Sequence, residues 1–143
     1  MVEKPKARKM KKQILAIDDS KAIRYLLQTV LGRDYKVTTA SDAASAMFWL
    51  TKKNLPDLII ADPRLPDTRD WELIQYLSTS GLFGNIPVIA LSSLDKKETA
   101  LKSRENGVKY YFQKPFNPIE LVKIVEQVIS NKPQFQEPSL KLV

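Results

Sequence analysis

The sequence LIIADPRLPD at residues 58–67 places an unbroken apolar run directly before an acid and two prolines. A strand that is covered on both faces needs apolar side chains at every position, so this run predicts a buried strand over residues 57–61. Asp62 follows that strand, and Pro63 and Pro66 prevent a helix from starting there. The stretch therefore predicts a central strand that presents a carboxylate at one edge of a sheet.

Strand-like and helix-like segments alternate five times along the chain. The predicted strands are residues 13–17, 35–39, 57–61, 86–91 and 109–112. The predicted helices begin at Ser20, residue 42, residue 70, Asp95 and Asn117, of which the three named residues are good N-caps. Because parallel strands need crossover connections, this alternation predicts an α/β fold with a five-stranded parallel sheet covered on both faces.

The length of 143 residues predicts a single domain, which we place at residues 13–131. Residues 1–12 carry six basic side chains and one acidic one, a charge of +5 out of the +7 of the whole chain. This arm is predicted to be flexible, as a solubilising terminus or, less favoured, as a contact for phosphates or an acidic partner. Residues 132–143 contain two prolines and no periodicity, and predict a C-terminal tail.

The composition excludes several classes of function. The chain has no Cys and no His, so it cannot form a thiolate or imidazole zinc site, a His-assisted nucleophile, a phosphohistidine or a disulfide. The apolar run before Asp18 is too short for a signal peptide, and no segment approaches the length of a membrane span. These features predict a cytoplasmic protein that uses carboxylate, hydroxyl and amine chemistry.

Polar side chains follow four of the predicted strands. In an open parallel sheet, ligands bind beyond the carboxyl ends of the strands, so these side chains should converge. Like charges at close range disfavour each other, and Mg²⁺ or Mn²⁺ with its preference for oxygen ligands would relieve that repulsion. An Asp can act as a nucleophile toward phosphorus, and an amine can neutralise the transferred group. The side chains concerned are Asp18, Asp19, Asp62, Ser92 and Lys114.

Four motifs at these strand ends resemble the signature of the response-regulator receiver domain of two-component signalling. They are ILAIDDS (14–20), LIIADPRLPD (58–67), PVIALSS (87–93) and YYFQKPFNP (110–118), and the resemblance covers about residues 12–131. It implies a doubly wound, flavodoxin-like (βα)5 sandwich with strand order 2-1-3-4-5, as in the single-domain CheY-like regulators. Any one motif is weak, whereas four in the right order are specific.

The resemblance also implies roles for single residues. Asp62 matches the phosphoacceptor, and Lys114 matches the lysine that contacts the phosphoryl oxygens. Asp18 and Asp19 match the acids that bind Mg²⁺ together with Asp62, and the backbone carbonyl of Arg64 matches a further ligand.

Two more positions match the residues that respond to phosphorylation in this family. Ser92 matches a hydroxyl that moves to bind the phosphate, and Tyr111 matches an aromatic side chain that turns inward with it. The peptide bond between Lys114 and Pro115 matches one that is usually cis. Taken singly, Ser92 has an ordinary alternative as a turn residue and Lys114 as a surface charge.

The function implied is a phosphoacceptor response regulator that receives a phosphoryl group on Asp62 from a histidine kinase or a phosphotransfer protein. It would not be an enzyme beyond autocatalytic phosphoryl acceptance and slow self-dephosphorylation. Its output would be phosphorylation-dependent binding of a protein target at the face from the fourth to the fifth helix, where a homodimer is an alternative. No nucleic-acid or membrane partner is expected.

Two other functions compete with this one. A pseudo-receiver would keep the fold and bind partners without phosphorylation, although the intact acids and Lys114 argue against it. A phosphatase of the haloacid-dehalogenase type would need a second Asp two residues after Asp62, where Arg64 stands. We therefore reject the enzyme.

Arg64, Leu94 and Asp70 are among the residues that depart from the family pattern. Arg64 and Leu94 should obstruct the approach of water to a phosphoryl group on Asp62, which predicts a long-lived phosphorylated state. Asp70 stands where the family usually has Gly. Because Asp tolerates a positive φ better than most residues, the loop either keeps that conformation at Asp70 or is rebuilt around residues 67–70.

Overall fold

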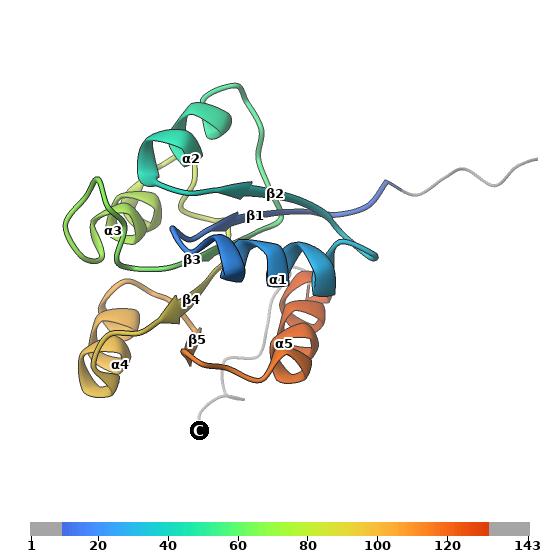
Figure 1. The fold of residues 1–143 in the computed structure, drawn as a ribbon. Coiled ribbons are helices and arrows are strands. Elements are labelled where there is room, and N and C mark those ends of the chain that lie inside the picture. The colour runs from blue at the N-terminus through green and yellow to red at the C-terminus, as the bar shows by residue number, and fades with distance from the viewer. Residues whose placement is uncertain (1–9, 132–143) are drawn as a thin grey trace, which may run out of the picture.

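Five parallel strands form one sheet in the order β2-β1-β3-β4-β5, which confirms the predicted α/β fold and its strand order. The fold comes from a computed structural model that describes residues 10–131 (Figure 1). The predicted tail and all but residues 10–12 of the predicted arm lie outside this range. The strands are β1 (Gln13–Ile17), β2 (Lys36–Ala40), β3 (Leu58–Ala61), β4 (Val88–Ser92) and β5 (Tyr110–Gln113).

Five helices connect and follow the strands. Side chains at the predicted N-caps accept hydrogen bonds from helix N–H groups, as at Ser20, Asp95 and Asn117. Asp42 caps its helix in the same way. The helices are α1 (Lys21–Leu31), α2 (Ala43–Leu50), α3 (Glu72–Thr79), α4 (Lys96–Glu105) and α5 (Pro118–Ser130).

Each face of the sheet has its own apolar core. Figure 1 shows α1 and α5 on one face of the sheet and α2 and α3 on the other. Because successive strand residues point to opposite faces, Ile14 and Ala16 pack with α1 and α5, whereas Leu15 and Ile17 pack with α2 and α3. All four residues of β3 are buried, which confirms the predicted central strand. None of the helices within residues 10–131 combines the length and the apolar character that crossing a bilayer requires.

The start of α3 differs from the prediction. The helix begins at Glu72 and not at residue 70, because Trp71 directly before it has a left-handed backbone with φ of 69°. The positive φ therefore lies at Trp71 and is not kept at Asp70. A bulky residue is rare in this conformation. Trp71 is 3% exposed, and its N–H donates to the carbonyl oxygen of Pro63 at 2.8 Å, so burial and this bond hold it in place.

Other boundaries shift by a few residues. The second helix begins one residue later than predicted, at Ala43; α2 ends at Leu50 and a turn follows, in which Lys53 has φ of 65°. The predicted fourth strand ended at residue 91, whereas β4 includes Ser92, because Ser92 pairs with Gln113 of β5. The backbone of Ser92 is therefore fixed as part of the sheet.

Candidate functional site

The backbone of the sheet positions two acids side by side. Ile17 of β1 is in register with Ala61 of β3, and the next residues are Asp18 and Asp62. The N–H of Asp62 donates to the carbonyl oxygen of Ile17 at 2.9 Å, and the N–H of Asp18 donates to that of Ala40 at 3.0 Å. These bonds extend the ladder by one residue, so both carboxylates leave rigid backbone at the same edge.

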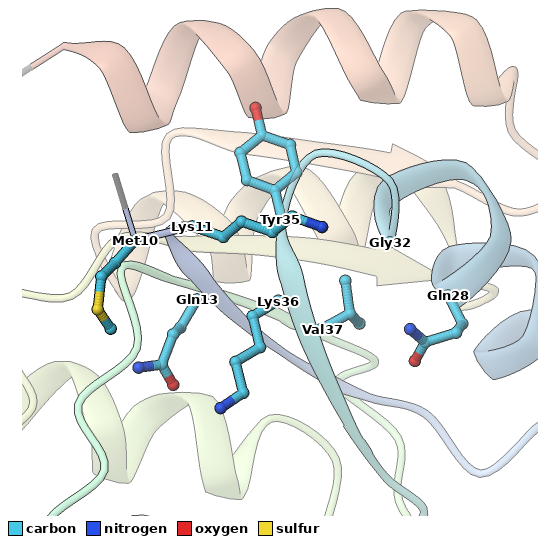
Figure 2. Close-up of a pocket in the computed structure, with 8 residues that line it drawn as sticks. All are labelled: Met10, Lys11, Gln13, Gln28, Gly32, Tyr35, Lys36 and Val37. Atoms are coloured by element: carbon cyan, nitrogen blue, oxygen red, sulfur yellow. The ribbon is translucent and has the colours of Figure 1, made fainter. Parts of the chain in front are cut away.

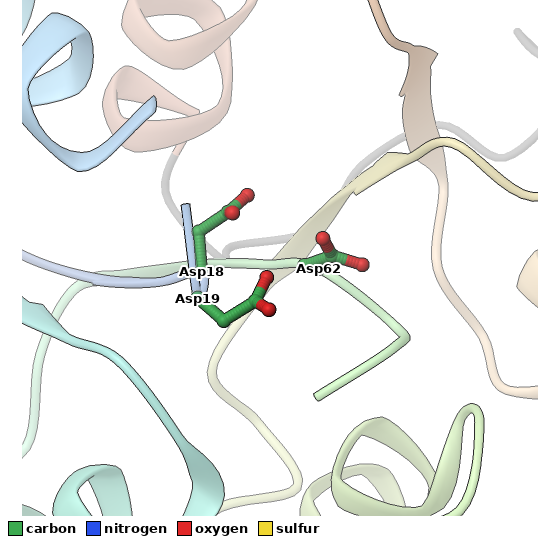
Figure 3. Close-up of side chains that lie close together, drawn as sticks. All are labelled: Asp18, Asp19 and Asp62. Carbon is green, nitrogen blue, oxygen red and sulfur yellow. The ribbon is translucent and has the colours of Figure 1, made fainter. Parts of the chain in front are cut away.

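Three carboxylates meet at this edge. Oxygen atoms of Asp18, Asp19 and Asp62 lie within 4.8 Å of one another, and Figure 3 shows the three side chains gathered beyond the strand ends. Asp18 is 1% exposed and Asp62 is 5% exposed, whereas Asp19 is exposed. Two of the three acids are therefore removed from water. In this buried position the repulsion between their charges is poorly screened.

Lys114 supplies a positive charge to the two buried acids. Its Nζ lies 2.7 Å from Asp18 Oδ2 and donates a hydrogen bond to Asp62 Oδ2 at 2.8 Å. The N–H of Lys114 donates to the carbonyl oxygen of Ser92 at 2.8 Å, which fixes the start of the lysine side chain on the sheet. The peptide bond from Lys114 to Pro115 is cis. The lysine thus reaches both acids from the end of β5.

Burial and pairing act in opposite directions on these groups. Burial is the largest influence on Asp62 and raises its pKa, although the hydrogen bonds from Lys114 and from the N–H of Arg64 lower it. The negative charge of Asp18 raises it further. For Lys114 burial alone would lower the pKa, but the contacts with Asp18 and Asp62 together outweigh burial and raise it. The lysine is therefore held in its charged form, and the charge of Asp62 is not fully compensated.

The donor set suits a hard divalent cation. Asp18 Oδ1 accepts a hydrogen bond from the N–H of Ser20 at 2.9 Å, whereas the buried Asp18 Oδ2 has no hydrogen-bond partner among the described residues beyond its ion pair with Lys114. Carboxylate oxygens that keep some free capacity, with one exposed acid beside them, match the ligands that Mg²⁺ or Mn²⁺ prefers. The residues present therefore fit the predicted metal, and the carbonyl of Arg64 remains a predicted further ligand.

The loop after Asp62 is fixed by contacts that the sequence did not predict. The N–H of Arg64 donates to Asp62 Oδ1 at 2.8 Å, and its guanidinium binds Asp70 through two hydrogen bonds of 3.2 and 3.0 Å. Asp67 accepts from the N–H groups of Ala43 and Ala44, both at 2.9 Å, at the start of α2. The bond from Ala43 is the largest influence that lowers the pKa of Asp67. The loop is thus attached to a helix that lies far from it in sequence.

Two predicted site residues are not joined to the acids. Ser92 is fully buried, and its Oγ accepts from the N–H of Leu94 and lies 2.9 Å from Thr99 Oγ1. Within residues 10–131 no hydrogen bond joins Ser92 to Asp62. Tyr111 is 37% exposed at the surface of β5. The structure therefore brings together the side chains of Asp18, Asp19, Asp62 and Lys114, whereas within residues 10–131 the side chains of Ser92 and Tyr111 make no hydrogen bond to them.

A shallow pocket lies elsewhere on the molecule. It is formed at the starts of β1 and β2, and Figure 2 shows Gln13 and Lys36 at its wall. The acids follow the ends of β1 and β3, so the pocket is at the opposite edge of the sheet. It is not part of the acidic site.

The raised pKa of Asp62 predicts that its charge destabilises the metal-free protein. The folded state holds a proton on Asp62 more tightly than the unfolded chain, so stability falls as pH rises from the ordinary Asp value of about 3.9 through the folded value. In EDTA at neutral pH, Asp62→Asn should therefore raise the free energy of unfolding, by on the order of 1 kcal/mol. Urea unfolding measures this.

Urea unfolding of Asp62→Asn and the wild type at a pH near the ordinary pKa of Asp checks whether the charge of Asp62 causes the difference in stability. The advantage of Asp62→Asn should shrink as the wild-type carboxyl becomes protonated. The control is Asp34→Asn, because Asp34 is an exposed acid in the turn before β2, at the opposite edge of the sheet. A stability difference that does not change with pH would show that the charge of Asp62 is not responsible.

Comparison with known proteins agrees with the fold. The model of the family described as "Response regulator receiver domain" matches residues 14–126. The transcriptional regulatory protein KdpE of Staphylococcus aureus is 35% identical over 123 residues, which are 83% of this chain and 52% of KdpE. Histidine kinase P4 of Formosa agariphila is 30% identical over 87% of this chain but only 9% of the kinase. The chain thus spans about half of the first relative and a small part of the second.

Solved structures of similar proteins are matched over nearly their whole length. The non-phosphorylated receiver domain of HemR from Leptospira biflexa gives a TM-score of 0.76 at 28% identity, covering 87% of this chain and 100% of that domain. The chemotaxis response regulator CheY4 of Vibrio cholerae gives 0.73 at 28% identity, covering 83% and 99%. Because the family match also spans most of the described residues, the chain belongs to the family of response regulator receiver domains.

Proposed function

We propose that this receiver domain accepts a phosphoryl group on Asp62 from a histidine kinase or a phosphotransfer protein. The observation that carries the proposal is the position of Asp62, a buried acid between Asp18, Asp19 and the ammonium of Lys114. A structural role does not explain three acids at one edge of the sheet. Two of them are buried next to each other, and the repulsion between their like charges opposes this arrangement. A phosphoryl group and its cation account for all four side chains.

The chemistry follows from the charges of these residues. A carboxylate oxygen of Asp62 attacks phosphorus, a new P–O bond forms, and the bond from phosphorus to the donor's imidazole nitrogen or leaving oxygen breaks. Lys114 stays protonated, because its pKa is raised, and faces the oxygens of the incoming group. Asp18, Asp19 and Asp62, with the carbonyl of Arg64, would hold Mg²⁺, which would neutralise the charge of the phosphoryl group.

The output proposed is a change in protein contacts and not a reaction on a second substrate. Ser92 would bind the phosphoryl group and Tyr111 would move with it. The surface of α4, β5 and α5 would then bind a protein target or a second copy of the chain. Several basic side chains lie on α4 and in the turn that leads to β5, which suits an acidic partner. They are Lys96, Lys97, Lys102, Arg104 and Lys109.

Mg²⁺ should stabilise the folded protein. An ion that binds only the folded state raises the free energy of unfolding by RT ln(1 + [Mg²⁺]/Kd), about 2.7 kcal/mol at about 100 times Kd. Thermal unfolding at increasing Mg²⁺ measures this. Asp18→Asn should abolish most of the increase, and Asp34→Asn should leave it unchanged. An equal response in all three proteins would indicate general salt effects and not binding at the acids.

Acetyl phosphate with Mg²⁺ should add one phosphoryl group to the protein. Acetate leaves as the Asp62 oxygen bonds to phosphorus, and intact-mass spectrometry detects the product. Asp62→Asn should gain no mass, Lys114→Met should react more slowly, and Asp34→Asn should match the wild type. A wild-type protein that gains no mass, from acetyl phosphate or from a phosphorylated histidine kinase, would instead support a pseudo-receiver.

The phosphorylated protein should lose its phosphoryl group slowly. Leu94 is 9% exposed and belongs to the same core as Leu65 of the loop after Asp62, and Arg64 of that loop is bound to Asp70. Arg64→Asn and Leu94→Asn should each raise the rate of phosphoryl loss several-fold, followed as the decay of the phosphorylated mass. Arg69→Asn changes an exposed arginine of the same loop and serves as the control. Unchanged rates in both test variants would mean that neither side chain limits the access of water.

A further inference from the structure

The helix α4 differs from the other described helices in what it buries. Its buried residues are Thr99 and Ser103, whereas α1, α2, α3 and α5 bury mainly Leu, Ile, Val or Ala. Within residues 10–131, α4 contributes no side chain to either apolar core. Burial of hydroxyl-bearing side chains gives little of the hydrophobic stabilisation that holds the other helices on the sheet. The attachment of α4 therefore depends on how its two hydroxyls are bonded.

The two hydroxyls have different surroundings. Thr99 Oγ1 lies 2.9 Å from Ser92 Oγ, and both residues are 0% exposed. Ser103, about one turn further along α4, is 1% exposed, and its Oγ has no hydrogen-bond partner among the described residues. The bond between Thr99 and Ser92 thus joins the buried face of α4 to the end of β4.

The backbone around Ser92 is held independently of this bond. The carbonyl oxygen of Ser92 accepts from the N–H of Lys114 at 2.8 Å and from Gln113 Nε2 at 3.2 Å. Gln113 Nε2 also donates to the carbonyl oxygen of Leu94 at 3.0 Å. With the main chain fixed on β5, the Ser92 hydroxyl can change partners only by rotation of its own side chain.

We infer that Thr99 is a positioning residue that holds the Ser92 hydroxyl on α4 until Asp62 is phosphorylated, an inference that rests on the proposed function. Ala61 is in register with Ala90, so one further step pairs Asp62 with Leu91 and puts Ser92 next along the strand. A phosphoryl group on Asp62 then competes with Thr99 for the same hydroxyl.

The consequence of that competition falls on α4. When Ser92 turns to the phosphoryl group, Thr99 Oγ1 loses its partner, and the two buried hydroxyls of α4 are then both unpaired. An unpaired buried hydroxyl disfavours the arrangement that buries it. Since no α4 side chain within residues 10–131 belongs to either apolar core, its displacement meets less apolar packing than that of the other helices would. The bond between Ser92 and Thr99 therefore couples the state of Asp62 to the docking of α4.

The affinity of the protein for beryllofluoride tests this inference, because this ion with Mg²⁺ stands in for the phosphoryl group. Thr99→Val keeps the shape of the side chain and removes the hydroxyl, so it should bind beryllofluoride on the order of fivefold more tightly, the effect of one net hydrogen bond. Thr99→Ser should retain wild-type affinity. The control is Leu101→Ala, which changes an exposed side chain of the same helix and should leave the affinity unchanged. Titration calorimetry gives each Kd.

The Ser92→Ala background separates positioning from a general effect on α4. There the substitution Thr99→Val should not change the affinity, because no Ser92 hydroxyl is left to hold. An equal tightening with and without Ser92, or none in the wild-type background, would overturn the inference while leaving the proposed function intact. If Thr99→Val fails to fold, Thr99→Ala provides the same comparison. Absence of beryllofluoride binding in the wild type would overturn the proposed function, and the inference with it.

Hydrogen exchange gives a second test, on α4 itself. Beryllofluoride should speed the exchange of α4 amides in the wild type, and Thr99→Val should exchange faster even without the ion. Amides of α5, which is held by Leu121 and Val125, provide the internal control. Exchange in α4 that is slow and equal in all states would contradict the coupling.

Discussion

The contacts of Lys114 with Asp18 and Asp62 are the constraint on which the site depends. Two buried carboxylates at the ends of neighbouring strands repel each other, and the ammonium offsets part of that repulsion. The arrangement holds because each side chain leaves rigid backbone, the acids from the ladder of β1 and β3 and the lysine from the end of β5. Among the described residues, Lys114 is the cation that forms ion pairs with these acids, so negative charge is left that a divalent cation would neutralise.

The same sheet sets how firmly its helices are attached. The cores on the two faces draw on α1, α2, α3 and α5, so those helices are held by apolar burial. In α4 the buried positions are Thr99 and Ser103, and the hydroxyl of Ser92 is hydrogen-bonded to that of Thr99. Stability and responsiveness are thus divided between elements. The apolar helices keep the acids in place, and the hydroxyl-lined helix is the one whose position can follow the site.

The loop after Asp62 shows why local reasoning succeeds in part. Pro63, Pro66 and the absence of Gly at residue 70 indicated an unusual loop, but the positive φ falls on Trp71. Which residue of the loop has the positive φ could not be predicted, because burial of the Trp71 indole and the bond from its N–H to the carbonyl of Pro63 hold that conformation. The pairing of Arg64 with Asp70 was likewise not evident from spacing alone.

The sequence by itself determined the α/β class, the family, the strand ends that carry Asp18, Asp19, Asp62 and Lys114, and the absence of His and Cys chemistry. Those features follow from periodicity and from what stands directly after each apolar run, which are local properties of the chain. Only the tertiary structure decided that Asp67 accepts from the first N–H groups of α2 and that the Ser92 hydroxyl is turned toward α4. These contacts join different elements near the edge of the sheet. The partner of a polar side chain there depends on which group lies within hydrogen-bond distance in the folded protein, and spacing along the sequence does not reveal it.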